Sequence, residues 1–231
     1  MLFCRLPYNM GFPDLQPLLQ SLLKSGRYSD LTISCEGRQF AVHRAIVCCQ
    51  SSFFDAAVKP GFKEAASSHI DLLDDEFATI QRVVDFLYIR DYDDTGFPDI
   101  EDKTSVSDDN KDSQAVLWNN LDVFMAADKF DIAPLKQLAR TRLLNWINKN
   151  ANRLPFIVRE IWVTLPPLET ELRDAIVKAI SCHAEEFLNN DESVAILTDL
   201  PAIAIAVLKE KVNENVLLKL QRQRMQVRGR Y

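Results

Sequence analysis

Residues Tyr28–Tyr92 read YSDLTISCEGRQFAVHRAIVCCQSSFFDAAVKPGFKEAASSHIDLLDDEFATIQRVVDFLYIRDY, and the spacing of their apolar residues changes along the run. Apolar and polar residues alternate at Leu31–Cys35 and again at Gln39–His43, which is the period of a half-buried strand. Gly37 lies between the two runs and suits a tight turn, because glycine adopts positive φ at little cost. We therefore predict a β-hairpin.

Helical spacing follows the hairpin. We expect two short helices from Arg44 onward and then a third strand at His69–Leu73. The next segment carries apolar residues in steps of three and four, at Phe77, Ile80, Val84 and Leu87. This spacing puts one apolar stripe on a helix. The predicted unit is a hairpin, two short helices, a strand and a helix.

Leucines dominate the segment before this unit. A helix beginning near Asp14 and ending at Gly26 would carry one wide apolar stripe, formed by Leu15, Leu18, Leu19, Leu22 and Leu23. Such a stripe is typical either of core packing or of a contact between subunits.

The composition indicates a globular chain of one large or two small domains. The chain has 231 residues, of which 47% are hydrophobic, and no apolar run approaches the length of a membrane-spanning helix. The N-terminal residues lack the apolar core of a signal peptide, so we expect an intracellular protein, cytoplasmic or nuclear. The five cysteines are odd in number, include no C-x-x-C, and form no zinc spacing with the three histidines. We expect no metal and no cofactor.

Charge is concentrated in one segment. Residues 91–112 contain nine acids and two bases, whereas the whole chain has a net charge of −6. Low hydrophobicity and self-repulsion predict a disordered, solvated loop there. A docking site for a basic partner is the alternative.

The remainder of the chain is predicted to be helical. We expect helices at 113–130 and from Pro134 to a boundary near 150, followed by helices at 154–163, 168–188 and 192–197. A final helix from Pro201 carries aliphatic residues at Ile205, Leu208, Val212, Val216 and Leu220. It ends in a basic tail without a base-reading motif, so a solvated helix end is favoured over nucleic-acid binding.

Catalytic motifs are missing from the sequence. It contains no Gly-rich phosphate loop, no G-x-S-x-G and no H-E-x-x-H. Cys48 and Cys49 lie near His43, but Ala45–Val47 make their surroundings apolar, where a buried thiol has a raised pKa and is inert. We therefore expect that the chain is not an enzyme.

Several blocks in order resemble the BTB/POZ domain, a mixed α+β fold in which helical hairpins flank a small sheet. The blocks are Asp30–Thr32, Phe40–Arg44, Ser51–Phe54, Phe62–Glu64, Ile70–Leu72, Phe86–Tyr88 and Leu121–Phe130. The resemblance implies a BTB/POZ domain at 14–150 and an all-helical C-terminal region at 151–231. It also implies a protein–protein interaction module without catalysis.

The resemblance further implies three kinds of site. BTB domains often form homodimers through their first helix, which here would use Leu15, Leu18, Leu19 and Leu22. A charged pair near the dimer centre maps to Asp30 and Arg44, for which a fold-stabilising role is an equal alternative. Cullin-binding members are similar in a hydrophobic-x-Glu element, matched here by Phe62 and Glu64.

Two functions remain open at this stage. One is a self-associating substrate adaptor for a cullin-RING ubiquitin ligase, which recruits an unknown target protein through its C-terminal helices. The other is a BTB scaffold or transcription-associated factor without a ligase role.

Overall fold

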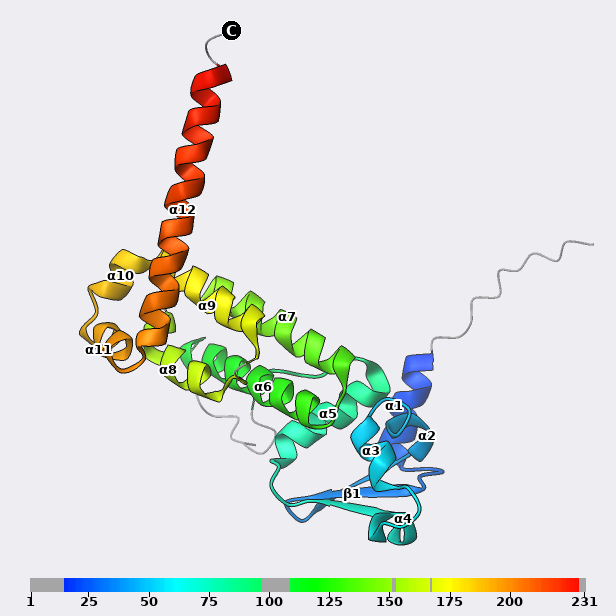
Figure 1. The fold of residues 1–231 in the computed structure, drawn as a ribbon. Helices are drawn as coiled ribbons and strands as arrows, with labels where there is room; N and C mark the ends of the chain where they lie inside the picture. Colours follow the sequence, from blue (N-terminus) through cyan, green and yellow to red (C-terminus); the bar gives the residue numbers. More distant parts are fainter. Residues whose placement is uncertain (1–14, 97–108, 151–152, 167, 229–231) are drawn as a thin grey trace, which may run out of the picture. The chain divides into compact units, whose positions relative to one another are not determined.

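The structure, a computed structural model, describes residues 15–96, 109–150, 153–166 and 168–228 (Figure 1). The chain divides into two compact units, Met1–Leu138 and Ala139–Tyr231. The division falls inside a helix, ahead of the boundary expected near residue 150.

The first unit is built on a three-stranded sheet of β1 (Leu31–Cys35), β2 (Arg38–Val42) and β3 (His69–Leu72), in the order β2-β1-β3. The hairpin strands β1 and β2 are antiparallel, and β3 runs parallel to β1. Every second residue is buried, which places one apolar face of the sheet in the core. The predicted hairpin and third strand are confirmed.

In the described part of the first unit, the sheet is accompanied by the start of α7 and by six whole helices: α1 (Leu15–Ser25), α2 (Arg44–Val47), α3 (Ser52–Ala57), α4 (Lys63–Ser67), α5 (Phe77–Ile89) and α6 (Asp109–Lys129). Three helices, rather than the two that were expected, therefore lie between the hairpin and β3. The two expected helices are α2 and α3, and Ser51 caps the start of α3 by accepting from Phe54 N at 3.2 Å. The additional helix is α4, one turn between Phe62 and Ser68.

The acidic segment 91–112, predicted to be a disordered loop, is ordered at both of its ends. Tyr92 is buried, and its hydroxyl donates to Asn120 Oδ1 at 2.6 Å. At the other end, α6 begins at Asp109, where acidic residues favour the positive end of a helix. The intervening part, 97–108, lies outside the described residues.

The second unit is helical, as predicted. It contains most of α7 (Ala133–Lys149), followed by α8 (Leu154–Thr164), α9 (Thr170–Cys182), α10 (Ala184–Leu188), α11 (Asp191–Asp199) and α12 (Pro201–Arg228). The single helix predicted for 168–188 is wrong, because the backbone leaves the helical region at His183 (φ −110°, ψ 28°) and divides it into α9 and α10. In the described part of the chain, no helix combines the length and hydropathy needed to cross a membrane.

Candidate functional site

Helix α1 is amphipathic, but the rest of the chain buries little of its apolar face. None of its eleven residues is buried, and Leu15 and Leu18 are 62% and 56% exposed. Leu19 and Leu22 are half-buried. The helix is attached to α5, whose Ile89 carbonyl accepts from Gln16 Nε2 at 2.6 Å. All four leucines predicted for a dimer contact thus lie on one helix, with two of them turned to solvent.

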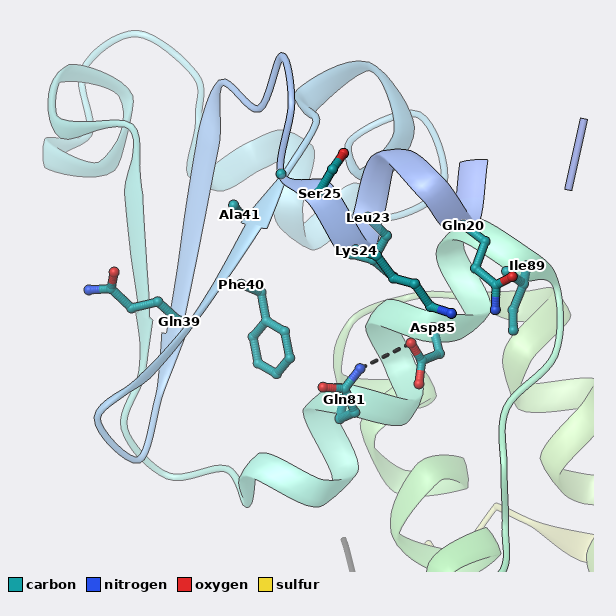
Figure 2. Close-up of a pocket in the computed structure, with 11 residues that line it drawn as sticks. Gln20, Leu23, Lys24, Ser25, Gln39, Phe40, Ala41, Gln81, Asp85 and Ile89 are labelled. Atoms are coloured by element: carbon teal, nitrogen blue, oxygen red, sulfur yellow. Dashed lines mark hydrogen bonds between the residues drawn. The ribbon is translucent and has the colours of Figure 1, made fainter. Parts of the chain in front are cut away.

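A cleft of about 450 Å³ opens between α1, β2 and α5, and Figure 2 shows the side chains that line it. It forms where α1 ends at Gly26, which has a φ of +61°. A Cβ added at Gly26 would lie 3.2 Å from the Ala41 Cβ of β2. Glycine therefore permits both the helix end and the close approach of α1 to the sheet.

Asp85 of α5 is the titratable group of this cleft that is most affected by its surroundings. Gln81 Nε2 donates to its carboxylate at 3.0 Å (Figure 2). Burial raises the pKa of the Asp85 carboxyl above its ordinary value of 3.8, while the Gln81 hydrogen bond and the Lys24 charge oppose part of that rise. Sequence reasoning missed this residue. The signal was a lone acid within the apolar run Val83–Tyr88.

Asp30 and Arg44 do lie together, but their contacts run through the backbone. The Asp30 carboxylate accepts from Arg44 N at 2.7 Å, at the start of α2, and Arg44 Nε donates to the Asp30 carbonyl at 3.2 Å. The guanidinium also donates to Ser68 Oγ at 2.7 Å. These contacts join the hairpin, α2 and the turn before β3, so the fold-stabilising alternative accounts for the pair as observed.

Phe62 and Glu64 lie at the start of α4 and differ in exposure. The Phe62 side chain is 59% exposed and immediately precedes the helix. The Glu64 side chain is only 24% exposed, and its carboxylate lies 3.9 Å from Lys63 Nζ. The pair therefore presents an apolar ring to solvent beside a half-buried acid in the first helical turn.

Comparison with known proteins identifies the family. The family model described as BTB/POZ domain matches residues 19–145, which is more than half of the chain. The chain belongs to the BTB/POZ family. The α+β architecture of the first unit and the helical extension agree with this family. The BTB/POZ domain is a protein-interaction fold.

Curated relatives match mainly over part of the BTB/POZ domain. Human kelch repeat and BTB domain-containing protein 4 is 36% identical over 73 residues, 32% of this chain and 14% of that protein. BTB/POZ domain-containing protein At1g55760 of Arabidopsis thaliana is 25% identical over 160 residues, 69% of this chain and 42% of that protein. The chain therefore spans less than half the length of these relatives. Among solved structures, the BTB domain of human gigaxonin is similar to 57% of this chain and 95% of its own, at 17% identity and a TM-score of 0.35.

His43 of the BTB/POZ unit is fully engaged in hydrogen bonds. Its Nε2 lies 2.7 Å from the Arg27 carbonyl and must donate, so Nδ1 accepts from the Tyr88 hydroxyl at 2.7 Å. Burial raises the pKa of Tyr88 to about 12. Burial also raises the pKa of the Cys48 thiol. Cys49, for which apolar surroundings were expected, is exposed, and both cysteines lie in the turn that follows α2. His43 therefore has no ring nitrogen left to activate a thiol.

Ser34, His69 and Asp71 form a second polar cluster on the solvent face of the sheet. Ser34 Oγ and Asp71 Oδ1 lie 3.0 Å and 2.8 Å from the same ring nitrogen, His69 Nε2. A catalytic triad instead uses opposite nitrogens of the imidazole for its serine and its acid. In the described ranges, no three His, Cys, Asp or Glu side chains are grouped so as to hold a metal ion.

Proposed function

We propose that this BTB/POZ protein is a self-associating interaction module that acts inside the cell as an adaptor, joining a second copy of itself, a cullin and a target protein. The observation that carries the proposal is the exposure of α1. Eleven residues form an amphipathic helix of which none is buried, and a helix of this kind normally covers its apolar face.

Self-association through α1 is supported by its charge as well as its exposure. Its only charged residue is Lys24, at the C-terminal end, so two copies can approach without strong repulsion along the leucine face. Burying one leucine side chain contributes about 1.5–3 kcal/mol. Symmetric burial of Leu15 and Leu18 from two subunits would thus supply several kcal/mol to a dimer.

Light scattering of the full chain tests the dimer. We expect wild type to have about twice the 26.4 kDa mass of one chain and the Leu15→Glu/Leu18→Glu variant to be monomeric. Leu73→Glu is the matched control, because Leu73 is 87% exposed in the same unit but lies outside α1. A monomeric wild type, or a dimer that the double variant leaves intact, would refute the proposal.

Binding to a cullin is supported by the position of Phe62. An exposed aromatic ring at a helix start can fill a partner's pocket, and a neighbouring acid can fix orientation through hydrogen bonds. The family resemblance assigns a hydrophobic-x-Glu element to cullin contact, and Phe62 and Glu64 occupy it.

A cullin N-terminal domain titrated against the chain tests this contact by calorimetry. We expect Phe62→Ala/Glu64→Ala to weaken binding at least tenfold, on the scale of a truncated interface anchor, and Leu73→Ala to leave it unchanged. If wild type does not bind, the chain is better described as a scaffold or transcription-associated factor without a ligase role. Equal binding by the double variant would place the cullin contact elsewhere.

A further inference from the structure

The long C-terminal helix α12 exposes a row of aliphatic side chains, formed by Ile205, Leu208, Val212, Val216 and Leu220, each of which is at least 47% exposed. At 100° per residue these five positions fall within about 120° of the helix circumference. We call them the α12 stripe. Figure 1 shows the C-terminal half of α12 extending past α9, α10 and α11 of its own unit.

A concave apolar surface adjoins the start of the α12 stripe. A groove of about 250 Å³ lies between α9, α10, α11 and α12, and its lining includes Phe187, Leu188, Leu197 and Leu208. Leu208 belongs to both features, so the groove and the stripe form one continuous surface. Leu188 is also more than half exposed. This combination of a groove and a helix face suits the apolar side chains of an approaching helix.

The charge of α12 restricts what can lie on this surface. The helix contains six bases and two acids, and one of the acids, Glu214, already pairs with Lys211 at 3.0 Å. No acid follows Glu214 along the chain. A partner that carries acids beside its apolar residues would gain electrostatic complementarity as well as apolar burial.

Two other occupants fit less well. A second copy of α12 in parallel would bring together two helices that each carry four more bases than acids, and this repulsion costs free energy. Helices that lie on lipid surfaces often carry Trp or Phe beside Leu on their apolar face, and residues 201–228 contain no Phe, Tyr or Trp. A flat lipid surface also leaves the groove beside Leu208 unfilled.

We propose that the α12 stripe and its groove bind a helical segment of another protein whose apolar residues recur every three or four positions and are flanked by Asp and Glu. The stripe spans 16 residues, from Ile205 to Leu220, so the partner helix needs a similar length of about 24 Å. The identification of this partner as the recruited target rests on the proposed adaptor function. The binding itself does not.

The probe is a synthetic 18-residue amphipathic peptide with Leu at helical spacing and Glu beside it, titrated against the full chain by fluorescence anisotropy. We expect saturable binding that Val216→Glu weakens at least tenfold. Leu217→Glu is the matched control. Leu217 is the next residue, has a similar exposure (59% against 49%), and points about 100° away. We expect it to change the affinity less than threefold.

Charge is tested with two further peptides of the same apolar pattern, one with Lys in place of Glu and one with Ser in place of Leu. Neither should bind measurably. Equal binding of the Lys peptide, or equal loss with Val216→Glu and Leu217→Glu, would overturn the proposal. Binding to phosphatidylserine vesicles alone, or a change of oligomeric mass caused by Val216→Glu, would assign the surface to lipid or to a second copy and would also overturn it.

The peptide experiment and the cullin experiment test the α12 proposal and the adaptor function separately. Phe62→Ala/Glu64→Ala should leave peptide affinity unchanged, and Val216→Glu should leave cullin binding unchanged. A wild-type chain that binds the cullin but not the peptide would refute only the α12 proposal. Circular dichroism checks the fold of the variants, and we expect them to remain helical because Val216 and Leu217 are both exposed.

Discussion

Helices α1 and α12 both turn aliphatic side chains toward solvent, yet they differ in charge. Helix α1 carries one base and no acid, whereas α12 carries six bases and two acids. An uncharged leucine face is compatible with its own copy, because nothing repels the approach. A strongly basic face is not, and its electrostatics favour an acidic partner. Exposure therefore indicates that a partner is needed, and charge indicates which kind.

The largest predicted effect is on the free energy of unfolding, and it distinguishes leucines buried in the core from the exposed leucines of α1. In a monomeric Leu15→Glu background, we expect Leu87→Ala to lower the free energy of unfolding by about 2–5 kcal/mol, because Leu87 is 2% exposed. Leu18→Ala in the same background should change it by less than about 0.5 kcal/mol. Urea unfolding measures both. A loss of about 2 kcal/mol or more with Leu18→Ala would show that α1 serves the core.

A smaller effect is expected at the end of α1. Gly26→Ala forces a side chain into a left-handed conformation and within 3.2 Å of the Ala41 Cβ, so we expect a loss of about 1–2 kcal/mol in thermal unfolding. Gly37→Ala has the same kind of φ but nothing within 4 Å. It should cost less and leave the dimer intact, while Gly26→Ala weakens the dimer. Equal effects of the two substitutions would mean that the close approach of Gly26 to β2 contributes neither to stability nor to the dimer.

Salt should distinguish the two surfaces. Raising the ionic strength from about 50 mM to about 500 mM should weaken binding of the acidic peptide to α12 about tenfold, since exposed charges are screened. The dimer dissociation constant, measured by sedimentation equilibrium in the same buffers, should change less than twofold. A dimer as salt-sensitive as the peptide complex would remove the distinction between the surfaces.

The smallest predicted effect concerns the cleft beneath α1. Because burial raises the pKa of Asp85, the folded chain holds that proton more tightly than the unfolded chain. Stability linked to this group is therefore present at low pH and is lost as the pH rises above 3.8. We expect the Tm of Asp85→Asn relative to wild type to increase between about pH 4 and about pH 8. A difference that stays flat over this pH range for Asp85→Asn would contradict the assignment.

Local spacing predicted much of the fold. The alternation at Leu31–Cys35 and the steps from Phe77 to Leu87 gave the hairpin and α5, because burial of one face imposes those periods. The break at His183 was missed, since it follows from packing among the last helices and no Gly or Pro marks it. The start of α6 at Asp109 was missed because composition alone does not distinguish an acidic loop from an acidic helix N-terminus.

The candidate surfaces were predicted unevenly. The leucines of α1 and the apolar positions of α12 could be read from spacing, but their exposure could not, because it depends on what the rest of the chain covers. Asp30 and Arg44 were paired by resemblance. Their backbone contacts required the positions of the hairpin and α2. The position of Asp85 in a cleft could not be predicted, because the cleft is formed by three elements, α1, β2 and α5, that are separated in sequence.

One measurement tests the assignment of both surfaces together: light scattering of Leu15→Glu/Leu18→Glu beside Val212→Glu/Val216→Glu, each at the same protein concentration. The account predicts that the α1 variant is monomeric and that the α12 variant keeps the mass of the wild-type dimer. A monomeric α12 variant, in which the α1 leucines are unchanged, would contradict it, because self-association would then depend on the basic helix.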